Sequence, residues 1–161
     1  MAAATHKTGV IGLGIMGRRM ITNLVNHDRF TNPCAWDPNP QACADAVAET
    51  PGLTIMGSAD AVIAAADLVY IATPPLWHRE YAERAMAAGK PVYSEKPLGI
   101  DVADSRALVT ELEESGIPNV VNFIQAASRA VTLTEERIDS GALGDITGAD
   151  IIVHFTRWPR D

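Results

Sequence analysis

Strands alternate with helices along most of this chain, and this alternation constrains the possible folds more than any other feature of the sequence. Short apolar runs at 8–11 and 67–72 have the length and composition of buried strands. Between them, Met16, Met20 and Leu24 recur every four residues, which is the spacing of one face of a helix. Strands that alternate with helices form parallel βαβ units. We therefore predict an α/β fold with a doubly wound parallel sheet of the Rossmann type.

The C-terminal segment departs from this alternation. A helix is predicted over 128–140, and a long β-rich run follows over 146–155. Apolar and polar residues partly alternate in that run, which is typical of a half-buried antiparallel strand. No further element follows before Asp161. We therefore expect residues 1–122 to form a dinucleotide-binding domain, and residues 123–161 to be the first helix and strand of a second α/β domain that is cut short.

Composition excludes several classes of partner. The 161 residues include 20 acidic and 13 basic side chains, for a formal net charge of −7, which argues against nucleic acid or an anionic membrane as a partner. No apolar run reaches the ~18 residues that a membrane span needs, and no signal-peptide pattern opens the chain. Cys34 and Cys43 lack the spacing of a metal site or a disulfide framework. We expect a cytoplasmic protein without a bound metal.

A glycine-rich segment, GLGIMG at 12–17, stands between a predicted strand and a predicted helix. In this context Gly12 permits a tight turn, Gly14 lets the backbone approach a pyrophosphate, and Gly17 lets the helix pack close to the strand. The free N–H groups at the helix N-terminus attract phosphates. An ordinary glycine-rich turn is the alternative. The predicted cofactor-binding residues of this segment are Gly12, Gly14, Ile15, Met16 and Gly17.

Asp37 follows the second predicted strand, about 20 residues after the last of these glycines. A carboxylate at this position can accept hydrogen bonds from the adenosine ribose hydroxyls, and it would repel a 2′-phosphate. The next residues, 38–40, include no basic side chain. These features favour NAD over NADP as the cofactor. The alternative is an aspartate that serves only the Asp-Pro turn.

Two further loops follow predicted strands at the edge of the sheet where ligands bind in this class of fold. In the first, Thr73 could donate a hydrogen bond to a cofactor, while His78 is either a ligand contact or a packing and capping residue. In the second, Lys96 could hydrogen-bond and protonate a substrate oxygen. The alternative there is a surface Glu-Lys pair before a turn.

Three segments, in this order along the chain, resemble the Gfo/Idh/MocA oxidoreductase family. ATPPLWH at 72–78 is similar to the family's TPxxxH loop, VYSEKPLG at 92–99 to its EKP motif, and SGALGDI at 140–146 to the segment that enters its second domain. The resemblance implies an N-terminal Rossmann domain that binds NAD(H) or NADP(H). It also implies a C-terminal α/β domain that supplies substrate contacts and often drives homo-oligomerisation.

The resemblance further implies hydride transfer between the nicotinamide cofactor and a sugar, cyclitol or related polyol. Lys96 resembles the family's catalytic lysine, and the peptide bond that follows this lysine is commonly cis. The further predicted cofactor-binding residues are Thr73, Pro74, His78, Glu95 and Lys96. The family's additional Asp and His, on a helix of the second domain, have no counterpart before Asp161. We therefore expect this chain alone to bind NAD with negligible turnover.

Two alternatives use the same residues. The segment 12–23 also resembles the β-hydroxyacid dehydrogenases, which act on small hydroxy acids and pair a Rossmann domain with an all-helical domain. The EKP loop and the β-rich C-terminal run do not fit that family. The second alternative is an NAD-binding regulatory module that catalyses no reaction of its own.

Overall fold

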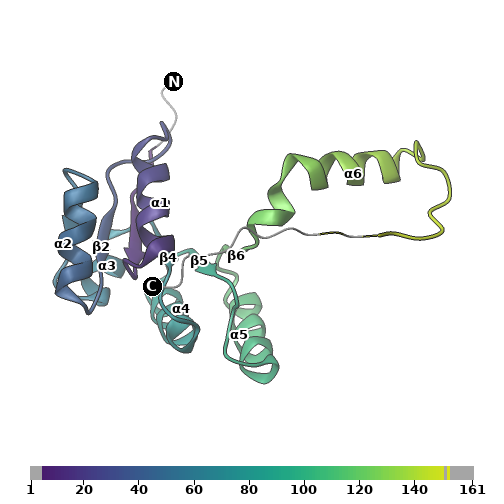
Figure 1. Ribbon diagram of the computed structural model, residues 1–161. Helices are drawn as coiled ribbons and strands as arrows, with labels where there is room; N and C mark the ends of the chain where they lie inside the picture. The colour runs from purple at the N-terminus through teal and green to yellow at the C-terminus, as the bar shows by residue number, and fades with distance from the viewer. Residues whose placement is uncertain (1–4, 151, 153–161) are drawn as a thin grey trace. The chain divides into compact units, whose positions relative to one another are not determined.

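The computed structural model describes residues 5–150 and 152 of the chain. The chain divides into two compact units, residues 1–123 and residues 124–161 (Figure 1). The first unit contains a parallel sheet of six strands in the order β3-β2-β1-β4-β5-β6. The strands are β1 (Thr8–Ile11), β2 (Cys34–Trp36), β3 (Thr54–Ile55), β4 (Leu68–Ile71), β5 (Val92–Glu95) and β6 (Asn119–Asn122). This order is that of a doubly wound Rossmann sheet, so the predicted fold class is confirmed.

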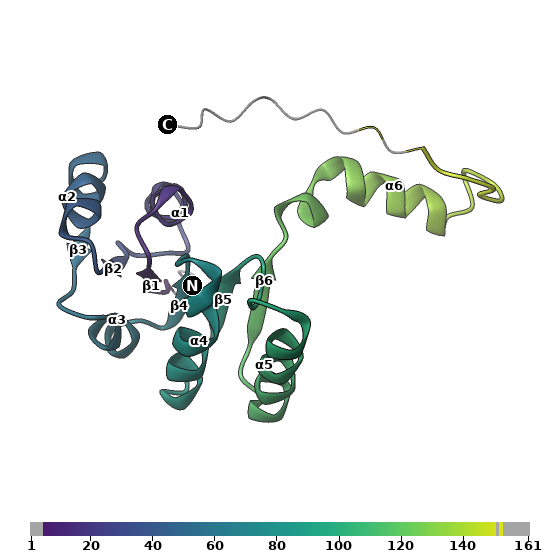
Figure 2. The same ribbon diagram turned by 60° about the horizontal axis from the view of Figure 1, so that its bottom comes forward.

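Helices cover both faces of this sheet (Figure 2). Two helices, α1 and α2, lie above it in that view, and three, α3, α4 and α5, lie below it. Their bounds are α1 (Ile15–Val25), α2 (Pro40–Glu49), α3 (Ala59–Ala65), α4 (His78–Ala87) and α5 (Val102–Ser115), with a short 3₁₀ turn η1 (Pro75–Trp77) before α4. The order of the strands reverses between β1 and β4. The connection that leaves β1 therefore crosses one face of the sheet, and the connection that leaves β4 crosses the other face. Loops at the carboxyl ends of β1 and β4 therefore diverge and leave room for a ligand.

Polar side chains fix where three of these helices begin. Asn39 accepts a hydrogen bond from the Gln41 N–H at the start of α2, and Ser58 and Asp101 cap α3 and α5 in the same way. Each such cap satisfies a backbone donor that has no partner within the helix, and each contributes about 1 kcal/mol. α1 differs, because its N-cap residue is a glycine with no side chain to cap it.

The core has two layers, one on each face of the sheet. Val10 and Tyr70 belong to the cluster that packs against α1, whereas the next residues along the same strands, Ile11 and Ile71, belong to the opposite cluster. All four are fully buried. Alternate residues of a strand point to opposite faces, so a strand buried on both faces has a continuous apolar sequence. This explains why the apolar runs of the sequence mark the central strands.

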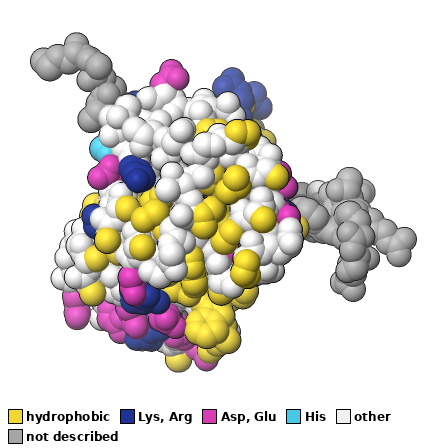
Figure 3. All heavy atoms as spheres, turned by 90° about the vertical axis from the view of Figure 1, so that its left-hand side faces the viewer, with side chains coloured by type: hydrophobic (Ala, Val, Ile, Leu, Met, Phe, Trp, Pro, Cys, Tyr) yellow, Lys and Arg dark blue, Asp and Glu magenta, His cyan; other side chains and the backbone are white. Residues whose placement is uncertain are grey.

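Seen from the α2 side, apolar side chains spread across the middle of the molecular surface (Figure 3). Acidic and basic side chains lie together along the lower part of the same face. Arg84 of α4 pairs with Asp60 of α3 and with Glu80 of α4 itself. Opposite charges therefore offset each other where these two helices meet.

The second unit contains a short 3₁₀ turn, η2 (Ile124–Ala127), and the amphipathic helix α6 (Arg129–Asp139), which Ser128 caps. The predicted helix is thus confirmed. The predicted strand over 146–155 is not observed at 146–150 and 152, which belong to no strand, and residues 151 and 153–155 lie outside the described residues. A strand needs a neighbour to satisfy its backbone groups, and the described residues of this unit include none. In the described part of the chain, no helix is both long and apolar enough to cross a membrane.

Candidate functional site

A cavity of about 690 Å³ opens where the loops that follow β1 and β4 diverge. Three connections line it: the glycine-rich segment after β1, the turn after β2, and the loop after β4. All three follow the carboxyl ends of strands, where ligands bind in doubly wound sheets. The lining residues are Gly12, Gly14, Ile15, Met16, Asp37, Pro38, Asn39, Ala42, Ala72, Thr73, Pro74, Trp77 and Tyr81.

The three glycines of the segment have different structural reasons to be glycine. Gly12 has a φ of +97°, and a Cβ atom there would lie 2.7 Å from the carbonyl carbon and oxygen of Ala72. A Cβ atom at Gly17 would overlap the carbonyl oxygen of Gly12. Gly14 has no atom within 4 Å of its Cβ position. Packing therefore requires Gly12 and Gly17, whereas Gly14 leaves open space on the cavity side of the chain.

The N-terminus of α1 offers backbone donors to this cavity. Gly14 provides no side-chain cap, and the first turn contains no acidic residue. Arg18 pairs with Asp45 and Glu49 of α2, with N–O distances of 3.8 and 3.5 Å. The N–H groups of the first turn and the positive end of the helix dipole are therefore available to an anion.

Asp37 joins the end of β2 to the glycine-rich segment. Its Oδ2 accepts a hydrogen bond from the Leu13 N–H at 2.7 Å, and its Oδ1 accepts one from the Asn39 N–H at 2.8 Å. The bond to Asn39 is the turn contact of the alternative interpretation, and the bond to Leu13 is additional. A carboxylate has about four acceptor positions, so two backbone bonds leave capacity for a ligand's hydroxyls.

Thr73 follows β4 and lines the same cavity. Its hydroxyl oxygen is buried and has no hydrogen-bond partner among the described residues. Buried polar atoms are normally paired, so this orphaned hydroxyl fits a polar ligand group. Pro74 lines the cavity beside it, and Trp77 and Tyr81 add an aromatic wall.

His78 lies below these loops and does not line the cavity. Its side chain is fully buried, with Nδ1 at 2.7 Å from the Pro97 carbonyl oxygen and Nε2 at 2.7 Å from the Thr73 carbonyl oxygen. Both ring nitrogens therefore face main-chain acceptors. Between the two predicted interpretations, this geometry favours the packing residue over a direct contact with the cofactor.

Glu95 is also buried, so the Glu-Lys segment is not a surface ion pair before a turn. Its side chain is 4% exposed, and its Oε1 accepts hydrogen bonds from the Tyr70 hydroxyl and from Asn122 Nδ2, the latter at 2.6 Å. The Tyr93 hydroxyl completes this polar network by donating to Asn122 Oδ1 at 2.8 Å. Lys96, the next residue, is exposed at the end of β5, and the Lys96–Pro97 bond is cis as the resemblance implied.

Sequence reasoning missed Tyr70, Tyr93 and Asn122 as members of this network. The available signal was the polar residue at the end of each of the last two strands. In a parallel register those ends meet, and Glu95 is indeed paired with Asn122 across β5 and β6. Within the described residues, no group of three or more His, Cys, Asp or Glu side chains is placed to hold a metal ion.

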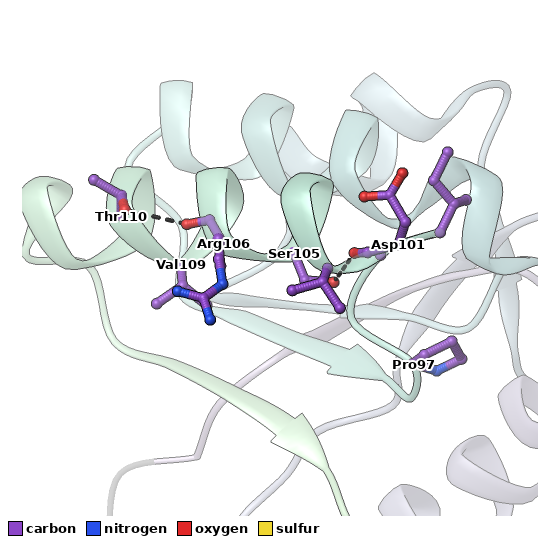
Figure 4. Close-up of a pocket in the computed structure, with 9 residues that line it drawn as sticks. Pro97, Asp101, Ser105, Arg106, Val109 and Thr110 are labelled. Atoms are coloured by element: carbon purple, nitrogen blue, oxygen red, sulfur yellow. Dashed lines mark hydrogen bonds between the residues drawn. The ribbon is translucent and has the colours of Figure 1, made fainter.

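A second hollow, of about 820 Å³, lies along the first turns of α5, next to Pro97 (Figure 4). The hydroxyls labelled there already have partners: Ser105 donates to the Asp101 carbonyl at 2.7 Å, and Thr110 donates to the Arg106 carbonyl at 3.1 Å. The remaining lining combines aliphatic side chains, such as Val109, with the side chain of Arg106. Unlike the first cavity, this hollow is not lined by the glycine-rich segment or by Asp37.

Burial and the neighbouring Glu95 both raise the pKa of Tyr70 well above its ordinary value. A raised pKa in the folded state stabilises the fold below pH about 10, and this contribution is lost as the pH rises towards the folded value. We expect Tyr70→Phe to lower stability by about 1.5–3 kcal/mol at pH 7, because a bond to a carboxylate is lost. We also expect its melting temperature to fall less steeply above pH about 10 than that of the unaltered chain.

Thermal unfolding followed by circular dichroism over this pH range measures both effects. Tyr81→Phe is the control, because the Tyr81 hydroxyl has no hydrogen bond to a carboxylate in the described structure, and it should retain most of the alkaline slope. Equal slopes for Tyr70→Phe and the unaltered chain would contradict the expectation.

Comparison with known proteins places the chain in a family. The model of an oxidoreductase family with an NAD-binding Rossmann fold, GFO_IDH_MocA, matches residues 6–123. A dTDP-3,4-didehydro-2,6-dideoxy-α-D-glucose 3-reductase of Streptomyces violaceoruber is 31% identical over 156 residues, which are 96% of this chain and 45% of that protein. An inositol 2-dehydrogenase of Cereibacter sphaeroides is 33% identical over 141 residues, which are 83% of this chain and 41% of that protein.

A solved structure of a dehydrogenase superposes closely on this chain. The scyllo-inositol dehydrogenase of Lactobacillus casei with bound cofactor NAD(H) and scyllo-inositol superposes with a TM-score of 0.80 at 26% identity, covering 89% of this chain and 43% of that chain. The chain thus spans less than half the length of the relatives it matches.

Proposed function

Because the chain belongs to the Gfo/Idh/MocA oxidoreductase family, we propose that it forms the cofactor-binding part of an enzyme that transfers hydride between NAD and a CH–OH group of a sugar, cyclitol or related polyol. The observation that carries this proposal is the cavity at the carboxyl ends of β1, β2 and β4, which is lined by an uncapped helix N-terminus and by Thr73, a residue whose buried hydroxyl has no partner among the described residues. An inositol dehydrogenase and a sugar-nucleotide reductase among the relatives support the substrate class.

The residues of the cavity fit a dinucleotide. The N–H groups at Ile15 and Met16 would hold the pyrophosphate, because Gly14 lets it approach the backbone closely. Asp37 would accept hydrogen bonds from the adenosine ribose, and Thr73 would donate one to the cofactor. The bound nicotinamide ring would supply or accept the hydride.

Lys96 is the proposed catalytic residue. It follows β5, the neighbour of β4, so it lies at the same edge of the sheet as the Thr73 loop. Lys96 would hydrogen-bond the reacting oxygen: its ammonium form would donate a proton to that oxygen in the reduction, and its neutral amine form would take one from it in the oxidation. Residues 123–161 would begin the second α/β domain, which would supply the other substrate contacts and the interface of a homo-oligomer.

Titration with NADH tests the proposal directly. Trp77 lines the cavity, so we expect NADH binding to quench tryptophan emission, and Trp77→Phe to remove most of that quenching. We expect negligible polyol oxidation by the 161-residue chain, and Lys96-dependent oxidation by a full-length protein that contains it. Failure to bind NADH would overturn the proposal. Binding without turnover in the full-length protein would support the regulatory-module alternative instead.

Asp37→Asn is expected to relax the preference for NADH over NADPH. Removing the negative charge removes its repulsion of a 2′-phosphate, so we expect the ratio of NADPH to NADH affinity to rise about tenfold, or 1.4 kcal/mol. Parallel fluorescence titrations with both cofactors measure this ratio. Asp28→Asn is the matched control, because Asp28 is exposed and does not line the cavity. If the unaltered chain binds NADPH as tightly as NADH, the role assigned to Asp37 is wrong.

A further inference from the structure

His78 lies between the two loops that carry the proposed site, and we infer that it is a positioning residue that holds these loops in one geometry. The inference rests on the proposed function, in which Thr73 contacts the cofactor and Lys96 the substrate. It assigns a role to a buried side chain that touches neither of them.

The ring of His78 spans the gap between the loops. Nδ1 lies 2.7 Å from the carbonyl oxygen of Pro97, the residue directly after Lys96, and Nε2 lies 2.7 Å from the carbonyl oxygen of Thr73. His78 is also the first residue of α4, a helix that packs on the sheet beneath both loops. One rigid side chain of this helix therefore lies against the main-chain carbonyls of both loops.

The loops have few backbone donors of their own with which to hold this arrangement. Pro74 and Pro75 in the first loop and Pro97 in the second each lack an N–H group. The carbonyls that face His78 are acceptors only. A neutral imidazole donates to one of them and a doubly protonated ring to both, so either form supplies at least one bond that the loops do not supply themselves.

This role differs from simple packing in what it predicts for substitutions. If His78 only fills space, phenylalanine is the best replacement, because it is apolar and of similar shape in a fully buried position. If His78 holds the carbonyls of Thr73 and Pro97, phenylalanine leaves both without a partner, and glutamine, which keeps an N–H donor, is the better replacement.

Hydrogen exchange in the cofactor-free chain tests the positioning directly. The Trp77 N–H bonds to the Pro74 carbonyl in the first loop, and the Ile100 N–H bonds to Asp104 next to the second. We expect His78→Phe to accelerate exchange at both amides by about tenfold, and His78→Gln to accelerate it less. His27→Phe makes the same change at an exposed histidine and should leave both amides unchanged. Unchanged exchange in His78→Phe would overturn the inference.

A double-mutant cycle in NADH affinity tests the functional consequence. Thr73→Val removes the orphaned hydroxyl, and we expect it to weaken NADH binding about fivefold in the unaltered chain but little further in the His78→Phe chain. Fully additive effects would overturn the inference. If the unaltered chain does not bind NADH, the proposed function fails, whereas the exchange experiment still decides whether His78 holds the two loops.

Discussion

Replacing Gly17 with alanine is expected to destabilise the fold by more than about 3 kcal/mol, which is a large fraction of the total stability of a typical domain. The new Cβ atom would overlap the carbonyl oxygen of Gly12. Gly12 has little room to move away, because its φ is +97° and a Cβ atom built on it would lie only 2.7 Å from the Ala72 carbonyl. The helix would have to separate from β1, and the α1 side of the core would open.

The same substitution at Gly14 is expected to change stability little and to weaken NADH binding strongly. Nothing lies within 4 Å of a Cβ atom at this position, and its φ of −67° suits any residue. We expect Gly14→Ala to cost at most about 1 kcal/mol, because alanine is a poorer N-cap than glycine. NADH affinity should nevertheless fall at least about tenfold, because the methyl group would enter the space proposed for the pyrophosphate.

Urea unfolding and NADH titration of both variants separate these expectations. Similar stabilities for Gly17→Ala and Gly14→Ala would show that the close contact of Gly17 is relieved easily, and would contradict the first prediction. Unaltered NADH affinity in Gly14→Ala would contradict the proposed position of the pyrophosphate next to Gly14.

Asn122→Asp is expected to produce the second large effect. Asn122 Nδ2 donates to Glu95 Oε1 at 2.6 Å, and the two side chains are 8% and 4% exposed. Aspartate would replace this donor with a second carboxylate against the first. Because water is largely excluded and no cation lies in the network, we expect a loss of about 3–5 kcal/mol at pH 7.

The pH dependence of this variant gives an independent check. Two adjacent buried carboxyls share a proton readily, which raises the pKa of one of them in the folded state. A raised pKa stabilises the fold at low pH, and that contribution is lost as the pH rises, so the deficit of Asn122→Asp should shrink in acid. Asn119→Asp is the matched control, because it makes the same change at an exposed position of the same strand. Thermal unfolding measures the stability of both variants. Equal losses of stability for Asn122→Asp and Asn119→Asp would contradict this account of the network.

Local patterns predicted the secondary structure well where their causes are local. The apolar runs at 8–11 and 67–72 predict buried strands, and β1 and β4 occupy 8–11 and 68–71. A helix is predicted over 128–140, and α6 spans Arg129–Asp139 with Ser128 as its cap. The β-rich run at 146–155 shows the limit of such patterns. Its residues favour a strand, but strand formation depends on a partner, and none is present among the described residues of that unit.

The candidate site was predictable only in part. The glycine spacing and Asp37 followed from the sequence, because each has a fixed offset from a strand. The role of His78 did not, since its acceptor at Pro97 is 19 residues away along the chain. The burial of Glu95 also depended on distant residues, because Tyr70 and Asn122 lie 25 and 27 residues from it.

By itself, the sequence determined the α/β class, the position of the glycine-rich turn and the edge of the sheet where ligands bind. These follow from hydrophobic periodicity and turn chemistry, which act over a few residues. Only the tertiary structure decided which polar side chains are buried and what they contact. It buried Glu95 within a network across β4, β5 and β6, and it buried His78 against the carbonyls of Thr73 and Pro97, outside the lining of the cavity. The reason is physical: burial and hydrogen bonding between neighbouring strands depend on register and helix packing, which join residues far apart in the chain.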